Sequence, residues 1–214
     1  MRRHWAAASS NMADKHIIIN IGRRFGSGGL GVARELSKRL DIPVYDSELI
    51  TAAAKSSGLG EEQFRGRDEK RRFWGIGSLF GSNRYGMVNE GLNDAQIFKI
   101  QSETIRKIAQ EGSAIFVGRA SNYVLRDMEC LDVFITASME TRVARVAERE
   151  GMTPADAEAY IRKQDKERES YYNFFTFGNW GDSADYDLCV DSDILGIEKT
   201  SELIIEFGRQ AGLL

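Results

Sequence analysis

The sequence contains little histidine, cysteine or proline, with two of each among 214 residues. The two histidines, His4 and His16, are too few and too far from other ligand residues to form a zinc site. Cys130 and Cys189 each lie in an apolar context, which favours two buried thiols over a disulfide framework. This cysteine usage indicates a reducing compartment, and we expect a cytoplasmic protein.

Long apolar runs are also absent. Runs such as "HIIINI" and "AIFV" fall far below the ~18 residues of a membrane span, so no membrane association is expected. Arg2 and Arg3 are not followed by the apolar segment of a secretory signal. The net charge of −3 argues against a general nucleic-acid binder. The expected partner is therefore a small molecule, and a homodimer is an open alternative to a monomer.

The composition is that of a globular protein, with 42% hydrophobic and 29% charged residues. The length suits one domain with a sizeable insertion. Residues 1–14 have no hydrophobic period and are interpreted as a disordered tail or leader, which leaves 15–214 as the folded domain.

Strands and helices are expected to alternate along this domain. Apolar runs predict strands at residues 16–21, 42–46, 113–119, 131–138 and 186–192. Helical spacing of apolar residues predicts helices at 30–40, 47–57, 95–111, 139–150, 153–175 and 197–210. Ser47 and Thr153 are candidate helix caps, and Pro154 suits a first helical turn. Such alternation predicts an α/β fold with a five-stranded parallel sheet.

A glycine-rich segment, "GRRFGSGG" at residues 22–29, joins the first strand to the first helix. Glycines let backbone amides approach an anion, and the helix that follows presents its positive end. We expect this loop to bind phosphate, although a tight turn without a ligand is the alternative. The expected phosphate-binding residues are Arg23, Gly26, Ser27, Gly28 and Gly29.

The loop departs from the standard pattern GxxxxGK[ST], because Gly29, Leu30 and Gly31 stand where a lysine and a hydroxyl residue are expected. Either Arg23 or Arg24 supplies the missing charge, or phosphoryl transfer is slow or absent. Ser27 is the nearest candidate for the hydroxyl that binds Mg²⁺.

Other charged residues follow predicted strands or lie on predicted helices. Arg119 stands at the end of a predicted strand, where ligands of parallel sheets bind, and could instead form a surface salt bridge. Asp46 is either a ligand or a helix cap. Arg142, Arg145 and Arg149 share one helical face, which could also be solvated. Asp165 and Arg168 could contact a nucleotide or simply form an ion pair.

Residues 59–95 give no clear pattern and are interpreted as an insertion with a loop. An aromatic group further on could cover the core, stack on a base or form a dimer contact, with core or interface preferred. Its members are Tyr171, Tyr172, Phe174, Phe175, Phe177 and Trp180.

Four segments of the chain resemble the bacterial cytidylate-kinase-like proteins, which are P-loop relatives of the bacterial CMP kinases. They are "RRFGSGGLGVARELSKRLDIPVYDSELI", "FVGRASNYVLRD", "VFITASMETRVARV" and "DKERESYY", and the resemblance extends from about Ile17 to Leu214. It implies a P-loop NTPase-type three-layer fold. It also implies a helical NMP-binding insertion, placed at 59–112, and a lid-type region at 140–180.

The resemblance also implies roles for particular residues. Arg119, Asp165 and Arg168 correspond to residues that hold the nucleotide, and Arg162 corresponds with a one-residue offset. Arg142 and Arg145 correspond to arginines near the phosphates. We therefore predict Arg24, Arg142 and Arg145 as catalytic residues. The predicted substrate-binding residues are Asp46, Arg119, Arg162, Asp165 and Arg168.

The predicted reaction is transfer of the ATP γ-phosphoryl group, with Mg²⁺, to a nucleoside monophosphate, CMP or dCMP first. Two alternatives remain open at this stage. One is a nucleotide-binding regulatory protein that kept the fold and lost the chemistry, for which the missing lysine is the main support. The other is a P-loop kinase of a non-nucleotide small molecule.

Overall fold

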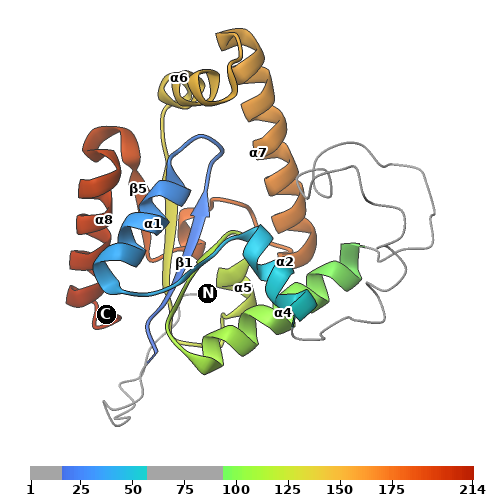
Figure 1. Ribbon diagram of the computed structural model, residues 1–214, viewed down its shortest axis with the longest axis vertical. Helices are drawn as coiled ribbons and strands as arrows, with labels where there is room; N and C mark the ends of the chain where they lie inside the picture. Colours follow the sequence, from blue (N-terminus) through green and yellow to red (C-terminus); the bar gives the residue numbers. More distant parts are fainter. Residues whose placement is uncertain (1–15, 57–93) are drawn as a thin grey trace.

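The computed structural model describes residues 16–56 and 94–214 (Figure 1). A sheet of five parallel strands forms its centre, in the order β2-β3-β1-β4-β5. The strands are β1 (Ile18–Arg23), β2 (Val44–Tyr45), β3 (Ala114–Val117), β4 (Leu131–Thr136) and β5 (Leu188–Asp191). The parallel five-stranded sheet expected from the sequence is confirmed.

Helices cover both faces of this sheet and extend beyond one edge (Figure 1). They are α1 (Gly29–Leu40), α2 (Ser47–Ser56), α4 (Asp94–Glu111), α5 (Ser121–Val124), α6 (Met139–Glu150), α7 (Pro154–Thr176) and α8 (Ser192–Gln210), with a 3₁₀ turn, η2 (Ser183–Asp185). No helix of the described ranges is both long and apolar enough to cross a bilayer.

Alternation along β1 explains the layers. Ile19 and Ile21 are fully buried in the core that includes α1 and α8. Ile18 points to the opposite face, where it packs in a second core with residues of α4 and α5. A strand buried on both faces needs apolar residues at successive positions, which is what the "HIII" run supplies.

Parallel pairing brings the carboxyl ends of the strands to one edge. Arg23 of β1 is in register with Ile135 of β4, and Thr136 of β4 with Asp191 of β5. The residues that follow β1, β3, β4 and β5 therefore meet at this edge, as the rule for ligand sites in parallel sheets expects.

Helices α6 and α7 form a lobe above this edge (Figure 1). Val146, Ala157 and Ile161 are buried in its small core, with Phe25 of the glycine loop packed against them. Thr153 caps α7 with Pro154 in the first turn, as predicted. The lobe lies within the lid-type region proposed at 140–180, whereas residues 1–15 and 57–93, and with them most of the proposed insertion, lie outside the described residues.

Two local predictions are wrong. The N-cap of α2 is Asp46, whose Oδ1 accepts hydrogen bonds from the amides of Glu48 and Leu49, both at 3.0 Å, and Ser47 is already helical. Cys130 is buried as expected, but Cys189 is exposed. It lies on β5, which is an edge strand and lacks the two-sided cover of the central strands.

Candidate functional site

The glycine loop lies where the sequence predicts it, between β1 and α1. The Arg24 amide donates to the carbonyl of Ile135 at 3.0 Å, so the pairing of β1 with β4 continues into the first residue of the loop. Gly26 and Gly28 have φ of 77° and 79°, a left-handed conformation that glycine adopts without strain. The first-turn amides of α1 that follow have no partner within the helix, which suits an anion.

Hydroxyl groups hold the loop in shape. Ser27 is fully buried, and its Oγ donates to the Arg24 carbonyl at 2.8 Å. The Ser27 carbonyl accepts a 2.6 Å hydrogen bond from Oγ of Ser192, the first residue of α8. Arg145 donates to the same Ser192 oxygen at 3.3 Å. The loop is therefore tied to the element that follows β5.

Asp165 of α7 joins the loop to the lobe. Its Oδ1 accepts from the Phe25 amide at 2.7 Å, and its Oδ2 accepts from Arg142 Nη1 at 2.6 Å. Arg142 and Asp165 are both buried, at 5% and 8% exposure. The carboxylate predicted to bind the substrate is thus engaged by the protein itself.

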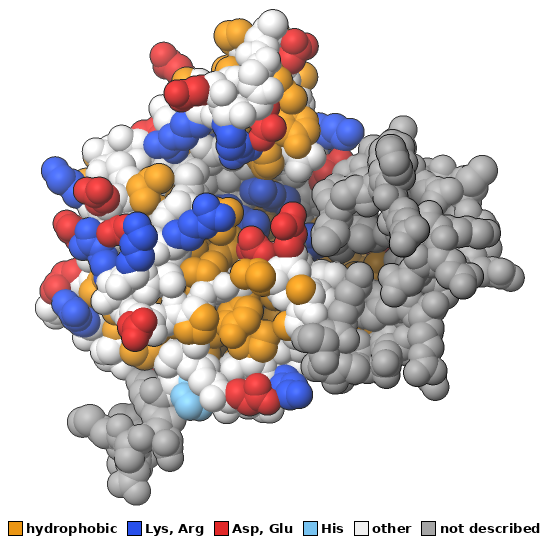
Figure 2. All heavy atoms as spheres, in the orientation of Figure 1, with side chains coloured by type: hydrophobic (Ala, Val, Ile, Leu, Met, Phe, Trp, Pro, Cys, Tyr) orange, Lys and Arg blue, Asp and Glu red, His pale blue; other side chains and the backbone are white. Residues whose placement is uncertain are grey.

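Three arginines gather beside the loop on the β3 side. Arg168 Nη1 donates to the Arg23 carbonyl at 3.0 Å. The Arg23 guanidinium lies against Gly118, the residue before Arg119. Figure 2 shows basic side chains between the α6–α7 lobe and the body below it. The cluster therefore brings Arg23, predicted to bind the phosphates of ATP, together with Arg119 and Arg168, predicted to bind the acceptor.

The positive charges of the three arginines repel one another, which raises the free energy of the cluster. Burial, followed by the charges of Arg168 and Arg119, holds the pKa of the Arg23 guanidinium well below its ordinary value. Burial is also the main cause that lowers the pKa of Arg168 to about 10, and the charge of Arg119 adds to it. At neutral pH Arg168 still carries its charge, so a bound anion would relieve the repulsion.

The turn after β3, which carries Arg119, has an unusual backbone conformation. Gly118, Arg119 and Ala120 have φ of 81°, 58° and 51°, three successive residues in a region that side chains rarely adopt. The Arg119 guanidinium carbon lies 5.1 Å from the centroid of the Tyr171 ring, a cation–π contact. Strain of this kind is typical of functional sites.

The other predicted residues lie at varied positions. Arg24 lies over Trp180, at 5.1 Å, with Nη1 3.7 Å from Asp165 Oδ2. Arg145 lies close to Gly28 of the loop and 3.9 Å from Asp193. Arg162 is exposed on α7 and pairs with Glu158 at 2.7 Å, so the described contacts do not bring it to the loop.

The residues of the loop do not present ligands suited to Mg²⁺. The Ser27 hydroxyl is buried and directed at the Arg24 carbonyl, and the Asp165 carboxylate is bonded to Phe25 and Arg142. Within residues 16–56 and 94–214, no group of three or more histidine, cysteine or acidic residues is placed to hold a metal ion. The Ser27 hydroxyl, predicted from the sequence as the Mg²⁺ ligand, is thus engaged within the loop.

The aromatic residues near the end of α7 divide among several roles. Tyr172 is buried and its hydroxyl accepts from Asn122 at 3.1 Å. Phe175 stacks on Phe98 of α4, with ring centroids 4.2 Å apart. Phe174 and Phe177 are exposed. Core packing explains part of the group, as preferred, and Tyr171 and Trp180 contact arginines of the site.

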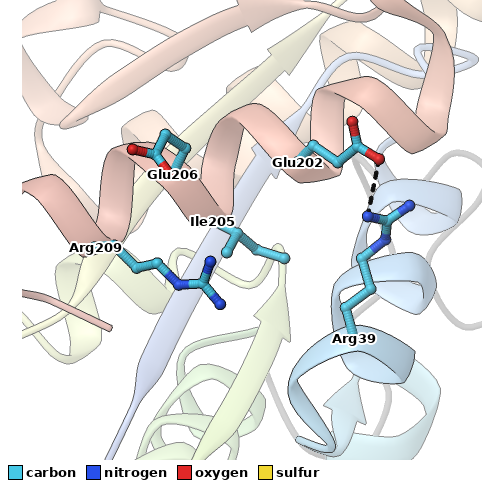
Figure 3. A pocket seen from close by; sticks show the side chains of 5 residues that line it. All are labelled: Arg39, Glu202, Ile205, Glu206 and Arg209. Atoms are coloured by element: carbon cyan, nitrogen blue, oxygen red, sulfur yellow. Dashed lines mark hydrogen bonds and ion pairs between the residues drawn. The ribbon is translucent and has the colours of Figure 1, made fainter.

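A surface pocket elsewhere contrasts with the loop region. It lies between α1 and α8, where Arg39, Arg209, Glu202 and Glu206 surround Ile205 (Figure 3). Arg39 pairs with Glu202 at 3.0 Å. These mixed charges neutralise one another, so the pocket lacks the positive excess of the loop region.

Sequence reasoning missed the residues after β5. Ser192 binds the loop carbonyl, and Asp193 Oδ2 accepts from the Ser138 amide, the N-cap residue of α6, at 2.7 Å. Ile197 of α8 packs against Gly31. A signal was present, because "DSD" at 191–193 stands at the end of a predicted strand, where ligands of parallel sheets bind.

A sequence profile decides the family. The Cytidylate kinase-like family matches residues 18–194, from the start of β1 to the start of α8. The chain belongs to the cytidylate kinase-like family. The cytidylate kinase of Staphylothermus marinus is 28% identical over 89% of this chain and 96% of its own. That of Methanopyrus kandleri is 24% identical over 88% and 91%.

Solved structures share this fold. An uncharacterized protein from Eubacterium ventriosum is 32% identical, with a TM-score of 0.70 over 90% of this chain and 98% of its own. Shikimate kinase from Bacteroides thetaiotaomicron is 12% identical, with a TM-score of 0.51 over 94% and 100%. That second likeness concerns the fold alone.

Proposed function

We propose that this protein transfers the γ-phosphoryl group of ATP to a nucleoside monophosphate, with CMP or dCMP as the first acceptors to test. The observation that carries the proposal is the convergence of a phosphate-type loop with Arg23, Arg119 and Arg168 at the carboxyl edge of the sheet. The cytidylate kinases among its relatives support a nucleotide kinase and suggest the base.

The donor fits the loop. The amides around Gly26, Gly28 and Gly29 and the first turn of α1 would hold the β-phosphate, because backbone N–H groups and the helix end favour anions. Arg145, close to Gly28 and held by Ser192, would add positive charge on the α8 side. Mg²⁺ would arrive bound to the phosphate oxygens of ATP and to water molecules, which this ion usually keeps as ligands.

The acceptor fits the β3 side. Its phosphate would lie among the guanidinium groups of Arg119 and Arg168, whose planar geometry suits phosphate oxygens. An acceptor phosphate oxygen attacks the γ-phosphorus, the bond from that phosphorus to the β–γ bridging oxygen breaks, and the bridging oxygen leaves with its electron pair on ADP. No general base is needed, since the attacking oxygen is already an anion. Alignment and neutralisation of charge then account for the catalysis.

The lobe would enclose the transfer. Asp165 connects α7 to the loop through the Phe25 amide and to α6 through Arg142, so movement of the lobe and shape of the loop are linked. Enclosure excludes water, which protects ATP from hydrolysis while no acceptor is bound.

The test is acceptor-dependent ADP formation. ADP release measured with ATP and Mg²⁺ should rise on addition of CMP and fall by a factor on the order of 10²–10³ in Arg119→Ala. Arg39→Ala is the control, since Arg39 lies in the pocket between α1 and α8. Equal ADP release with and without every monophosphate tried would contradict the proposal.

The absence of a loop lysine favours one second candidate, a nucleotide-binding protein without chemistry. Saturable binding of ATP with no turnover would select it. Turnover with a non-nucleotide acceptor alone would instead select a small-molecule kinase, a class that the same fold accommodates.

A further inference from the structure

Position 29 is where the standard loop carries its lysine, and here it is glycine. A Cβ atom at this position would lie 2.7 Å from Cβ and 2.9 Å from Cγ of Arg23. Atoms do not approach so closely, so the stem of Arg23 occupies the space in which a side chain at position 29 would begin. The φ of Gly29 is not positive, so only this neighbour, and not the backbone, excludes a side chain.

The same arginine ends in the centre of the site. Its guanidinium lies against Gly118, where an added Cβ would overlap Nη1. Gly118 opens the turn that presents Arg119, and the Arg23 carbonyl is the acceptor for Arg168. Arg23 therefore passes beside the first residue of α1, and its guanidinium lies near the two arginines proposed for the acceptor.

Its neighbour Arg24 points elsewhere. The Arg24 guanidinium lies over Trp180, and its charge is partly matched by Asp165 at 3.7 Å. Burial is the first cause that lowers the pKa of Arg23, and Arg168 and Arg119 add to it, so the guanidinium of Arg23 lies close to two other positive charges.

We propose that Arg23 performs the role of the missing loop lysine: its guanidinium binds the transferring phosphoryl group, and Gly29 and Gly118 lack side chains so that Arg23 can lie there. This inference rests on the proposed function and assigns a catalytic residue within it. It distinguishes Arg23 from Arg24, both of which the sequence leaves as candidates.

Removal of the charge is the first test. Arg23→Gln keeps most of the stem, and kcat for nucleoside diphosphate formation should fall on the order of 10²–10³, with a smaller change in KM for ATP. Arg23→Lys should retain more activity than Arg23→Gln. Arg39→Ala is the matched control for loss of one arginine outside the site.

Exchange of the two positions is the sharper test. Arg23→Gly removes the obstructing stem, so Arg23→Gly/Gly29→Lys should accommodate a standard lysine. Its kcat should be roughly tenfold higher than that of Arg23→Gly/Gly29→Ala, which places a side chain at position 29 without charge. A tenfold difference would recover part of the activity that is lost when the Arg23 charge is removed. Circular dichroism would confirm that each variant is folded, and if the glycine variants do not fold, the comparison of Arg23→Gln with Arg23→Lys decides.

The outcomes separate the two claims. Unchanged kcat in Arg23→Gln, or equal kcat in the lysine and alanine exchange variants, would overturn the role of Arg23 and leave the kinase standing. If the unmodified protein forms no diphosphate from any acceptor, the proposed function fails, and the role of Arg23 fails with it.

Discussion

Arg142 of α6 and Asp165 of α7 form a 2.6 Å hydrogen-bonded ion pair that is almost fully buried. The same carboxylate binds the Phe25 amide of the glycine loop. One side chain therefore connects the consecutive helices α6 and α7 to the glycine loop, which lies 140 positions earlier in the sequence. This connection fixes the position of the lobe relative to the loop, and the proposed phosphate binding depends on the shape of that loop.

Loss of Asp165 should destabilise the protein. Asp165→Ala leaves the buried Arg142 charge without its partner, which typically costs about 3–5 kcal/mol. The free energy of unfolding from urea denaturation measures it. Glu158→Ala on the same helix removes an exposed pair of similar length, 2.7 Å to Arg162, and should change stability by less than about 1 kcal/mol. Equal effects of the two substitutions would contradict the structural role of Asp165.

Phosphate-bearing ligands should stabilise the fold. Pyrophosphate relieves the repulsion among Arg23, Arg119 and Arg168, and at 100 times its Kd it adds about 2.7 kcal/mol. For a protein of this size the melting temperature should rise by roughly 5–10 °C, as followed by thermal unfolding. The rise should shrink at high salt and in Arg168→Ala, but not in Arg39→Ala. A shift of equal size in Arg168→Ala would place the anion elsewhere.

The contact of Arg119 with Tyr171 should affect acceptor binding. Tyr171→Leu keeps an apolar neighbour but removes the ring face that holds the guanidinium, a contact worth about 0.5–2 kcal/mol. We expect KM for the acceptor to rise several-fold, with KM for ATP unchanged. Tyr123→Leu removes a comparable contact with Arg126 and serves as the control. Equal changes for both nucleotides would contradict this division of the site.

Alkaline pH should weaken the fold through buried tyrosines. Burial raises the pKa of Tyr172 to about 12, and burial also raises that of Tyr186. Their neutral forms stabilise the native state fully below pH 10, and this stability is lost as pH rises through the native pKa. Between pH 10 and 12 each group contributes a slope of about −1.4 kcal/mol per pH unit.

Urea denaturation across this pH range would measure the slope. Tyr172→Phe should reduce it. A slope that is unchanged by Tyr172→Phe would mean that the phenol ionises as easily in the native protein as in the unfolded chain.

The fold could be predicted because its signals are local. The β-branched run before the loop, the glycines and the cap at Thr153 each act within a few residues, and the structure confirms them. The partners of Asp165 could not be predicted in this way. Asp165 and Arg168 are three residues apart, yet one binds Phe25 and the other Arg23, more than a hundred residues away.

The two adjacent loop arginines illustrate the same limit. Successive residues at a strand end point to opposite sides, so the sequence could indicate that Arg23 and Arg24 diverge. It could not say which of them faces Arg119, since that depends on the strand order β3-β1-β4. The rule that ligands bind at the ends of parallel strands could have indicated Ser192, which follows β5. It could not have predicted the hydrogen bond from Ser192 to the Ser27 carbonyl.

The most direct test of the account is a separation of products. The purified protein would be incubated with ATP, Mg²⁺ and, in turn, CMP, dCMP, UMP, AMP and GMP, and the nucleotides resolved by chromatography. CDP or dCDP should form in amounts equal to the ADP formed, with less diphosphate from the other acceptors. Failure to form a diphosphate from any of the five would contradict the proposed function.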